Sequence, residues 1–303
     1  MRLCAIIPTD AVCAVCRAPQ ITKVQWSHTN GFTGMKEETA MPEEKIILCA
    51  HRGDKKYCPE NTMPAFEASV KFGVDMIETD IHMTSDGELV HLHDSNTLRT
   101  TGVDAIINNI TLAEAQALDA CNGMEKFHGV KIPTVREFLD LVAPTDIVIN
   151  WELKDYPRDV GDEKAFECAD KLIDLIREYK MEERSIINSF SDRVLEHVYK
   201  KYNGEFCILG QGIYKCPKTI DKAEVPQEEM YYWCCMYPEG PGLKAVDAKD
   251  SFDYCLEHNL VPCICCEDTM ENYKKTLEYG CKMYTSNDIY EGARILKELG
   301  LRD

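Results

Sequence analysis

From Lys45 onward, short apolar runs alternate with longer amphipathic segments along the chain. This alternation is typical of repeated βα units, in which helices pack around a parallel sheet. The apolar runs give nine candidate strands: Ile46–Ala50, Met76–Met83, Glu88–His93, Ile147–Leu153, Ser185–Asn188, Glu205–Leu209, Tyr231–Cys235, Val261–Cys265 and Lys282–Thr285.

The second and third candidate strands are joined by only four residues, Thr84–Gly87. A connection between parallel neighbours needs a dozen or more residues, so these two strands cannot be parallel. The Asp86-Gly87 pair is a strong hairpin-turn signal. The sequence therefore predicts an antiparallel hairpin at this point.

When one hairpin arm is set aside, eight strands remain, and most of their connections can hold a helix. The clearest helical segments are Glu163–Tyr179, Ser191–Tyr202, Lys249–His258 and Thr269–Tyr279. Eight strands with interleaved helices in about 250 residues predict an α/β fold, a TIM (β/α)8 barrel with a small hairpin insertion after the second strand. An open doubly wound sheet is the alternative, but no Gly-rich turn of the dinucleotide or P-loop kind follows the first strand.

Residues 1–44 show no helical or strand period and are predicted to form an irregular tail ahead of one barrel domain at 45–303. Met35 and Met41 precede the first strand, so the sequence leaves open whether the natural product starts at Met1. The segment Met1–Gln20 is interrupted by proline and by charged residues and fits a secretory signal poorly. A cytoplasmic location is therefore the default expectation.

The charge of the chain limits its partners. It carries 34 Lys and Arg against 52 Asp and Glu, a net charge of −18, which disfavours nucleic acid and anionic membrane surfaces. No apolar run approaches the roughly 18 residues of a membrane span, so no stable membrane insertion is expected. An anionic small molecule would need local positive charge, which a divalent cation and one or two basic side chains would supply. The oligomeric state stays open.

The sixteen cysteines are scattered through predicted strands and helices, which indicates reduced, mostly buried thiols rather than a disulfide framework. Cys13 and Cys16 have the spacing of a redox or zinc half-site, but no second pair has matching spacing. Cys263, Cys265 and Cys266 lie in an apolar run, where they are interpreted as small core residues.

Acidic residues fall at predicted strand ends. Glu78 and Asp80 lie two residues apart, so both side chains point to the same face of their strand. Glu152 and Lys154 have the same spacing at the end of another strand. Three carboxylates that meet in this way form a hard oxygen site of the kind that holds one Mg²⁺ or Ca²⁺, although each acid taken singly fits an ordinary ion pair.

Histidines accompany the acids. His51 and Arg52 directly follow the first strand, and the returning hairpin arm brings His93 back over the carboxylates. Two imidazoles near a phosphodiester suit the base and the acid that its hydrolysis needs. Arg52 and Lys154 would bind phosphate oxygens, or else pair with the neighbouring acids. His82 and His91 are rivals to His93, but each lies inside a strand arm, where a structural role is favoured.

A series of motifs resembles the glycerophosphodiester phosphodiesterase family. The order and spacing of the motifs agree across residues 46–154. They are Ala50-His51-Arg52-Gly53, Pro59-Glu60-Asn61-Thr62, Glu78-Thr79-Asp80, Leu92-His93-Asp94, Arg99-Thr100-Thr101-Gly102 and Glu152-Leu153-Lys154. A single His-Arg-Gly would be weak support, whereas the series is highly specific.

The resemblance implies a TIM barrel that binds one divalent metal. It also implies an enzyme that hydrolyses small glycerophosphodiesters to sn-glycerol 3-phosphate and an alcohol. The implied roles are metal ligands Glu78, Asp80 and Glu152, catalytic His51 and His93, and substrate contacts Arg52, Lys154 and Glu60.

The second half of the chain departs from the family pattern. Cys263-Ile264-Cys265-Cys266 stands where many members have Trp-Thr-Val-Asn, and the usual final Thr-Asp is Thr285-Ser286-Asn287-Asp288. The pocket wall is therefore expected to differ, with Gln211–Lys215 and Trp233–Gly240 as candidate wall segments. The alcohol group of the substrate does not follow from the sequence.

Other activities stay open beside simple hydrolysis. One is a lysophospholipase D that acts on larger substrates, and another is a phosphodiesterase that forms a cyclic phosphate. A non-catalytic polyol-phosphate binding module would be signalled by lost catalytic residues, and none of the residues named above is missing.

Overall fold

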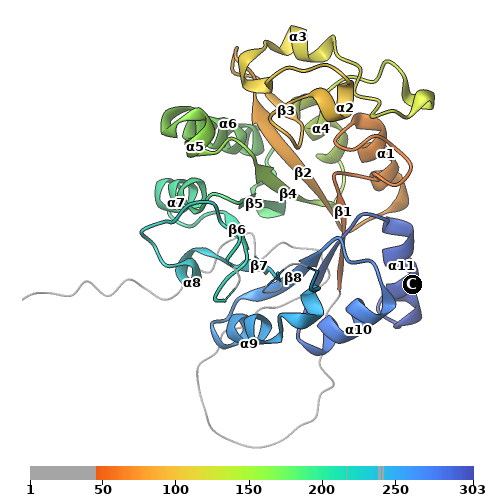
Figure 1. The fold of residues 1–303 in the computed structure, drawn as a ribbon, viewed down its shortest axis with the longest axis vertical. Helices are drawn as coiled ribbons and strands as arrows, with labels where there is room; N and C mark the ends of the chain where they lie inside the picture. The colour runs from red at the N-terminus through yellow and green to blue at the C-terminus, as the bar shows by residue number, and fades with distance from the viewer. Residues whose placement is uncertain (1–45, 216, 238–239, 241) are drawn as a thin grey trace, which may run out of the picture.

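The computed structural model describes residues 46–215, 217–237, 240 and 242–303, and within them eight parallel strands form a closed barrel (Figure 1). In chain order the barrel strands are β1 (Ile47–His51), β2 (Met76–Met83), β4 (Val148–Leu153), β5 (Ser185–Ser189), β6 (Cys207–Gln211), β7 (Trp233–Cys235), β8 (Val261–Cys265) and β9 (Met283–Ser286). Strand β1 pairs with β2 on one side and with β9 on the other, which closes the sheet. The TIM-barrel prediction is confirmed, and the open doubly wound alternative is wrong.

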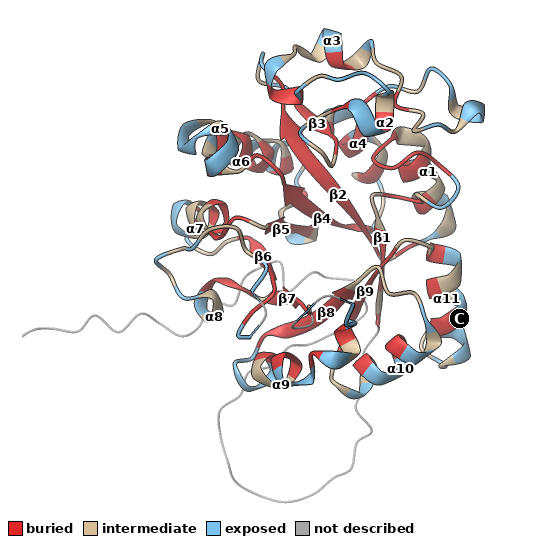
Figure 2. Cartoon of the chain, in the orientation of Figure 1, coloured by how far each residue is buried: buried red, intermediate tan, exposed pale blue. Residues whose placement is uncertain are grey.

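Helices cover the outside of the barrel. They are α1 (Met63–Phe72), α4 (Val135–Val142), α5 (Pro157–Val160), α6 (Asp162–Glu178), α7 (Asp192–Lys201), α8 (Gln227–Met230), α9 (Lys249–Glu257), α10 (Met270–Glu278) and α11 (Ile289–Glu298). Their inner faces are buried against the strands and their outer faces are exposed (Figure 2). The predicted strands and the four predicted helices agree with the structure to within two residues at each end.

The predicted hairpin is confirmed. Strand β3 (Leu89–His91) runs antiparallel to β2, with Ile81 opposite His91. The insertion continues beyond the hairpin through α2 (Leu98–Thr101), η2 (Ile107–Asn109), α3 (Leu112–Gln116) and η3 (Glu125–Phe127). It has a small apolar cluster of its own, formed by Val90, Leu92, Ile107, Ala115, Ala120 and Ile132.

The core has two layers that follow the alternation of side chains along each strand. Cys49 and Met76 belong to a cluster inside the barrel, whereas their neighbours Leu48 and Ile77 pack with the helices. Residues two positions further along the inner faces therefore reach the carboxyl end of the barrel interior, where barrel active sites lie.

The predicted tail at residues 1–44 lies outside the described residues, so its boundary with the barrel domain stays a prediction. Within the part of the chain that the structure describes, none of the helices has the length and apolar character to cross a membrane. The cytoplasmic location also stays a prediction.

The turn after β1 depends on Gly53. This residue has φ +77, and a Cβ placed there would lie 2.8 Å from the backbone carbonyl carbon of Ala65 in α1. Gly102 has a similar φ of +75, but the space around it is open. The two glycines therefore separate backbone strain from steric overlap.

We expect Gly53→Ala to lower the free energy of unfolding by about 3 kcal/mol. Left-handed backbone accounts for about 1–2 kcal/mol, and overlap with the helix backbone adds about 1–3 kcal/mol. Gly102→Ala is the matched control, and its free energy of unfolding should fall only by the part that comes from the left-handed backbone. Urea unfolding followed by circular dichroism measures both variants, and equal destabilisation would rule out the steric contribution.

Candidate active site

Three carboxylates meet at the carboxyl end of the barrel. Glu78 and Asp80 come from β2, and Glu152 comes from β4, where it lies opposite Asp80 in the strand register. All three are buried, and one oxygen of each lies within 4.8 Å of an oxygen of the other two. The structure thus brings together the three acids that the sequence selected.

Two cations neutralise this cluster. Arg52 Nε lies 3.2 Å from Asp80 Oδ2, and Lys154 Nζ lies 3.1 Å from Asp80 Oδ1 and also contacts Glu152. Burial opposes ionisation of Asp80, but Lys154 and Arg52 overcome it and hold the pKa of Asp80 below its usual range. Burial and the nearby charge of Asp80 raise the pKa of Glu78. The two cations therefore balance the cluster while Glu78 holds its proton, and the fully ionised cluster would carry one excess negative charge.

The donor set fits a hard divalent cation. Glu78 Oε1 is buried and has no hydrogen-bond donor among the described residues. A buried carboxylate oxygen without a donor is costly, and a bound cation would satisfy it. Carboxylate oxygens are the ligands that Mg²⁺ and Ca²⁺ prefer.

The loop that follows β1 is fastened to the carboxylates. Arg52 and Asn61 both have left-handed backbones, with φ 59 and φ 55. The Arg52 backbone N–H donates to Glu78 Oε2 at 3.0 Å, and Asn61 Nδ2 donates to Asp80 Oδ2 at 2.7 Å. The sequence did not select Asn61 as a site residue, although it lies in the Pro-Glu-Asn motif.

Glu60 lies behind Arg52 and does not line the cavity. Its Oε1 accepts hydrogen bonds from Arg52 Nη1 at 2.9 Å and from Arg99 Nη2 at 2.8 Å. Burial raises the pKa of Glu60, but Arg99 and Arg52 outweigh this effect and lower it to about 2. The contacts indicate that Glu60 orients Arg52, and direct substrate contact by Glu60 stays a prediction.

His51 and His93 both line the cavity. His51 Nε2 lies 3.8 Å from Glu78 Oε2, and Asn287 Oδ1 lies 2.6 Å from His51 Nδ1. Burial lowers the pKa of His51, but the hydrogen bond with Cys266 and the charge of Glu78 together raise it to about 9.

The surroundings of His93 differ from those of His51. His93 Nδ1 pairs with Asp94 Oδ1 at 2.6 Å, and Arg99 Nε donates to the other oxygen of Asp94 at 2.5 Å. Burial lowers the pKa of His93 below its ordinary value. Asp94 and Arg99 thus fix the orientation of the His93 ring.

The rival histidines lie within the packing and outside the cavity lining. His82 Nδ1 contacts Asp155 Oδ1 at 2.6 Å, and His91 Nδ1 contacts Thr79 Oγ1 at 2.6 Å. His91 also packs edge-on against Phe66. These contacts agree with the predicted structural role of both histidines.

The cavity has a volume of about 210 Å³. It is lined by His51, Arg52, Glu78, His93, Asn150, Glu152, Lys154, Asn188, Phe190, Leu209, Gln211, Cys235, Tyr237, Cys263, Cys265 and Thr285. Both predicted wall segments contribute, through Gln211 and Tyr237. Tyr237 donates to Gln211 Oε1 at 2.5 Å, and Gln211 Nε2 donates to Asn188 Oδ1 at 2.8 Å.

Sequence reasoning missed one polar residue of this wall that strand alternation could have found. This residue is Asn150, which lies between Val148 and Glu152 on the inner face of β4.

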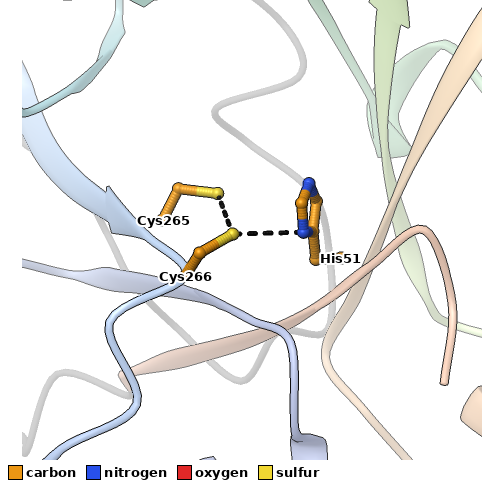
Figure 3. A group of neighbouring side chains, drawn as sticks. All are labelled: His51, Cys265 and Cys266. Carbon is orange, nitrogen blue, oxygen red and sulfur yellow. Dashed lines mark hydrogen bonds between the residues drawn. The ribbon is translucent and has the colours of Figure 1, made fainter. Parts of the chain in front are cut away.

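The interpretation of the late cysteines as core residues holds only in part. Cys263 is buried inside the barrel, but Cys265 and Cys266 are partly exposed and lie beside His51 (Figure 3). The hydrogen bond with Cys265 lowers the pKa of Cys266 to about 4 despite burial, and His51 adds to this effect. The cysteines in the described residues are free thiols. Cys13 and Cys16 lie outside the described residues.

The fold and the site together define a class. A closed βα barrel with buried acids, histidines and basic side chains at the carboxyl ends of its strands is a TIM-barrel protein with a candidate metal centre. A model of the glycerophosphoryl diester phosphodiesterase family matches residues 51–235. The chain belongs to this family.

Individual relatives are similar over part of the chain. A glycerophosphodiester phosphodiesterase of Caldanaerobacter subterraneus subsp. tengcongensis is 42% identical over 161 residues, which make up 52% of this chain and 63% of that protein. The lysophospholipase D GDPD1 of Rattus norvegicus is 28% identical over 171 residues, 53% of this chain and 50% of that protein. The matches thus span about three-fifths and one-half of these curated relatives.

A solved structure shares the fold. It is that of an Oleispira antarctica phosphodiesterase in complex with the product sn-glycerol 3-phosphate, with a TM-score of 0.69. It covers 84% of this chain and 97% of the other, and the two are 18% identical. At this identity the likeness concerns the barrel alone.

We expect Glu60→Gln to destabilise the chain at neutral pH, because two guanidinium groups lose their shared carboxylate. The pKa of Glu60 is lowered from 4.5 to about 2, so its stabilisation is complete above pH of about 5 and is lost as the pH falls towards 2. A shift of this size corresponds to about 3 kcal/mol.

Urea unfolding at pH 6 and pH 3 tests this expectation. The difference in free energy of unfolding between the unsubstituted chain and Glu60→Gln should shrink by more than half at the lower pH. Glu88→Gln is the control at an exposed position and should show a constant difference. A pH-independent difference for Glu60→Gln would contradict the stabilising role of the ionised carboxylate.

Proposed function

We propose that this protein is a metal-dependent phosphodiesterase that hydrolyses glycerophosphodiesters to sn-glycerol 3-phosphate and an alcohol. The observation that carries the proposal is the cavity itself. Glu78, Glu152, two basic side chains and two histidines line one space of about 210 Å³, and the buried Asp80 lies directly behind them in the same carboxylate cluster. Membership of the family and the names of its relatives support the same reaction.

The basic side chains hold the phosphodiester. Arg52 and Lys154 line the cavity and are both anchored to Asp80, so their positions are fixed before a substrate enters. Arg52 has its second anchor in Glu60. Fixed cations avoid the entropy that flexible side chains lose when they bind an anion, and they stabilise the negative charge that grows on the phosphoryl oxygens.

Glu78, Asp80 and Glu152 would hold one divalent cation, Mg²⁺ or Ca²⁺. When bound, this ion polarises the phosphoryl oxygens and offsets the charge of the carboxylates. Glu78 has a further task in the chain itself, because its Oε2 accepts from the Arg52 backbone and faces His51. It therefore links the metal position to the catalytic loop.

His51 and His93 serve as the acid/base pair. The two rings are held by different partners, His51 by Asn287 and His93 by Asp94. One ring removes a proton from the attacking oxygen, and the other donates a proton to the leaving alkoxide. The attacking oxygen belongs either to water or to a neighbouring hydroxyl of the glycerol, which would give a cyclic phosphate.

A lysophospholipase D activity is the second candidate. A relative with that name is similar to 53% of the chain. The cavity of about 210 Å³ accommodates a compact polar group, so an acyl chain would extend outside it. Turnover of lysophosphatidylcholine compared with glycerophosphocholine separates the two candidates.

We expect EDTA-sensitive release of glycerol 3-phosphate from glycerophosphocholine or glycerophosphoethanolamine. Adding back Mg²⁺ or Ca²⁺ should restore turnover, and phosphorus NMR should show whether a cyclic ester accumulates. Turnover that persists after complete metal removal would overturn the metal requirement. Tight binding without turnover under any metal would favour the binding-module alternative.

We expect His93→Gln to lower kcat by about 10²–10⁴-fold, the usual contribution of a general acid or base. His51→Ala should also abolish most activity, whereas His197→Gln is the control, because His197 stacks on Phe166 on the outside of the barrel. Steady-state kinetics with saturating metal measures the loss. Full activity of either variant at the cavity would refute the role given to that histidine.

A further inference from the structure

A cluster of soft ligands lies beside His51, whose Nδ1 contacts Cys266 while its Nε2 faces Glu78. A ring nitrogen of His51 and the sulfurs of Cys265 and Cys266 all lie within 4.8 Å of one another. Figure 3 shows both thiols beside the same face of the ring, with Cys266 between Cys265 and one ring nitrogen. The Cys266 sulfur lies 3.1 Å from Nδ1 and 2.9 Å from the Cys265 sulfur.

The backbone brings the two thiols together. Consecutive side chains of an extended strand point to opposite faces, so adjacent cysteines at the end of β8 would normally diverge. Cys266 instead has φ 65, a left-handed conformation that is unfavourable for a residue with a Cβ. A hydrogen bond of 2.7 Å from its backbone N–H to Thr285 O holds it against β9. The strained position places both sulfurs beside one imidazole.

We infer that His51 Nδ1, Cys265 Sγ and Cys266 Sγ form a second metal site, which takes a soft divalent cation of the Zn²⁺ class. Thiolate and imidazole donors select such ions, whereas the carboxylate cluster selects hard ones. Each ligand binds the ion in its deprotonated form, so any proton still held on the two sulfurs or on Nδ1 is released. The three side chains leave the fourth position to water or to the amide oxygen of Asn287.

The distances are compatible with such an ion after a small opening of the cluster. Zinc–sulfur bonds of about 2.3 Å and zinc–nitrogen bonds of about 2.0 Å in a tetrahedron place two sulfurs about 3.8 Å apart, and a sulfur and a nitrogen about 3.5 Å apart. The observed separations of 2.9 Å and 3.1 Å are shorter, and the whole set lies within 4.8 Å. Rotation of the two cysteine side chains supplies the difference.

Occupation of this site would change the imidazole. An amide oxygen only accepts hydrogen bonds, so His51 Nδ1 donates to Asn287 Oδ1 when no metal is bound. A metal ion bound to Nδ1 replaces the proton on that nitrogen. The neutral ring then carries its single proton on Nε2, the nitrogen that faces Glu78. His51 then cannot accept a proton through Nε2, so a soft cation on Nδ1 stops His51 from serving as the base of the reaction proposed above.

The test is a Co²⁺ titration of the reduced full-length chain in the presence of excess Mg²⁺. Thiolate-to-cobalt charge transfer and tetrahedral ligand-field bands report sulfur ligation, whereas the carboxylate cluster gives only weak oxygen-type absorption. We expect one equivalent of Co²⁺ to produce both bands and Zn²⁺ to displace it. The background for every sample carries Cys13→Ser and Cys16→Ser, so that this pair does not contribute.

Matched variants assign the ligands. Cys265→Ser and Cys266→Ser should each lower the Co²⁺ affinity at least tenfold and weaken the charge-transfer band, since even outer partners of metal ligands contribute about 10–100-fold. Cys263 lies on the same strand but inside the barrel, so Cys263→Ser should leave the Co²⁺ affinity and the charge-transfer band unchanged. Cys121→Ser controls for the separate Asp119–Cys121–His128 group. Bands that survive both serine variants at 265 and 266, or that never appear in the parent chain, would overturn the site.

The inhibition rests on the proposed function and has a separate readout. Zn²⁺ at the concentration that displaces Co²⁺ should inhibit turnover in the parent, and the ratio of activities with and without Zn²⁺ should rise towards one in Cys266→Ser. Bands without any phosphodiesterase activity would leave the site intact and refute the proposed function instead. Zn²⁺ binding that leaves turnover unchanged would refute the effect on His51.

Discussion

The buried carboxylate of Asp80 is the anchor on which the site depends. Its two oxygens lie within 3.2 Å of Arg52 and Asn61, from the loop after β1, and of Lys154, which follows β4. Taking a carboxylate out of water costs several kcal/mol, so removing any one of these partners would leave the buried charge less compensated and destabilise the fold. The same contacts that stabilise Asp80 therefore fix the groups that the proposed reaction needs.

Charge balance explains why this cluster can accept a cation. Three carboxylates face two side-chain cations, so the fully ionised cluster carries one excess negative charge. Burial and the neighbouring charge of Asp80 raise the pKa of Glu78, which lessens that excess. A dication would change the sign of the cluster to positive, which suits a phosphodiester anion, and it would ionise Glu78 by supplying the partner that its Oε1 lacks.

The sequence could predict what depends on local periodicity. Strand alternation places Glu78 with Asp80 and Glu152 with Lys154, whatever the rest of the fold, and the short link before Gly87 forces the hairpin that returns His93. Predicting these features required only residues that are close together in the sequence. The barrel followed because repeated βα units have few ways to bury a parallel sheet.

Features that depend on closure of the barrel were not predictable. Asn287 reaches His51 only because β9 pairs with β1, across 236 positions of sequence. Cys266 was interpreted as a core residue because alternation continues through an ideal strand, whereas the chain turns left-handed at that point. The hydrophobic pattern predicts neither the register in which β9 pairs with β1 nor a positive φ at a single residue.

The position of His51 follows from the local sequence, whereas some of its contacts depend on closure of the barrel. Its place after β1 follows from the sequence, and its Nε2 faces the oxygen cluster as that place requires. Its Nδ1 faces Asn287 and the thiol of Cys266, which only the closed barrel brings there. An imidazole transmits a change at one nitrogen to the other, because the neutral ring carries a single proton. Through this ring, the second half of the barrel contacts the histidine that the first half contributes to the proposed acid/base pair.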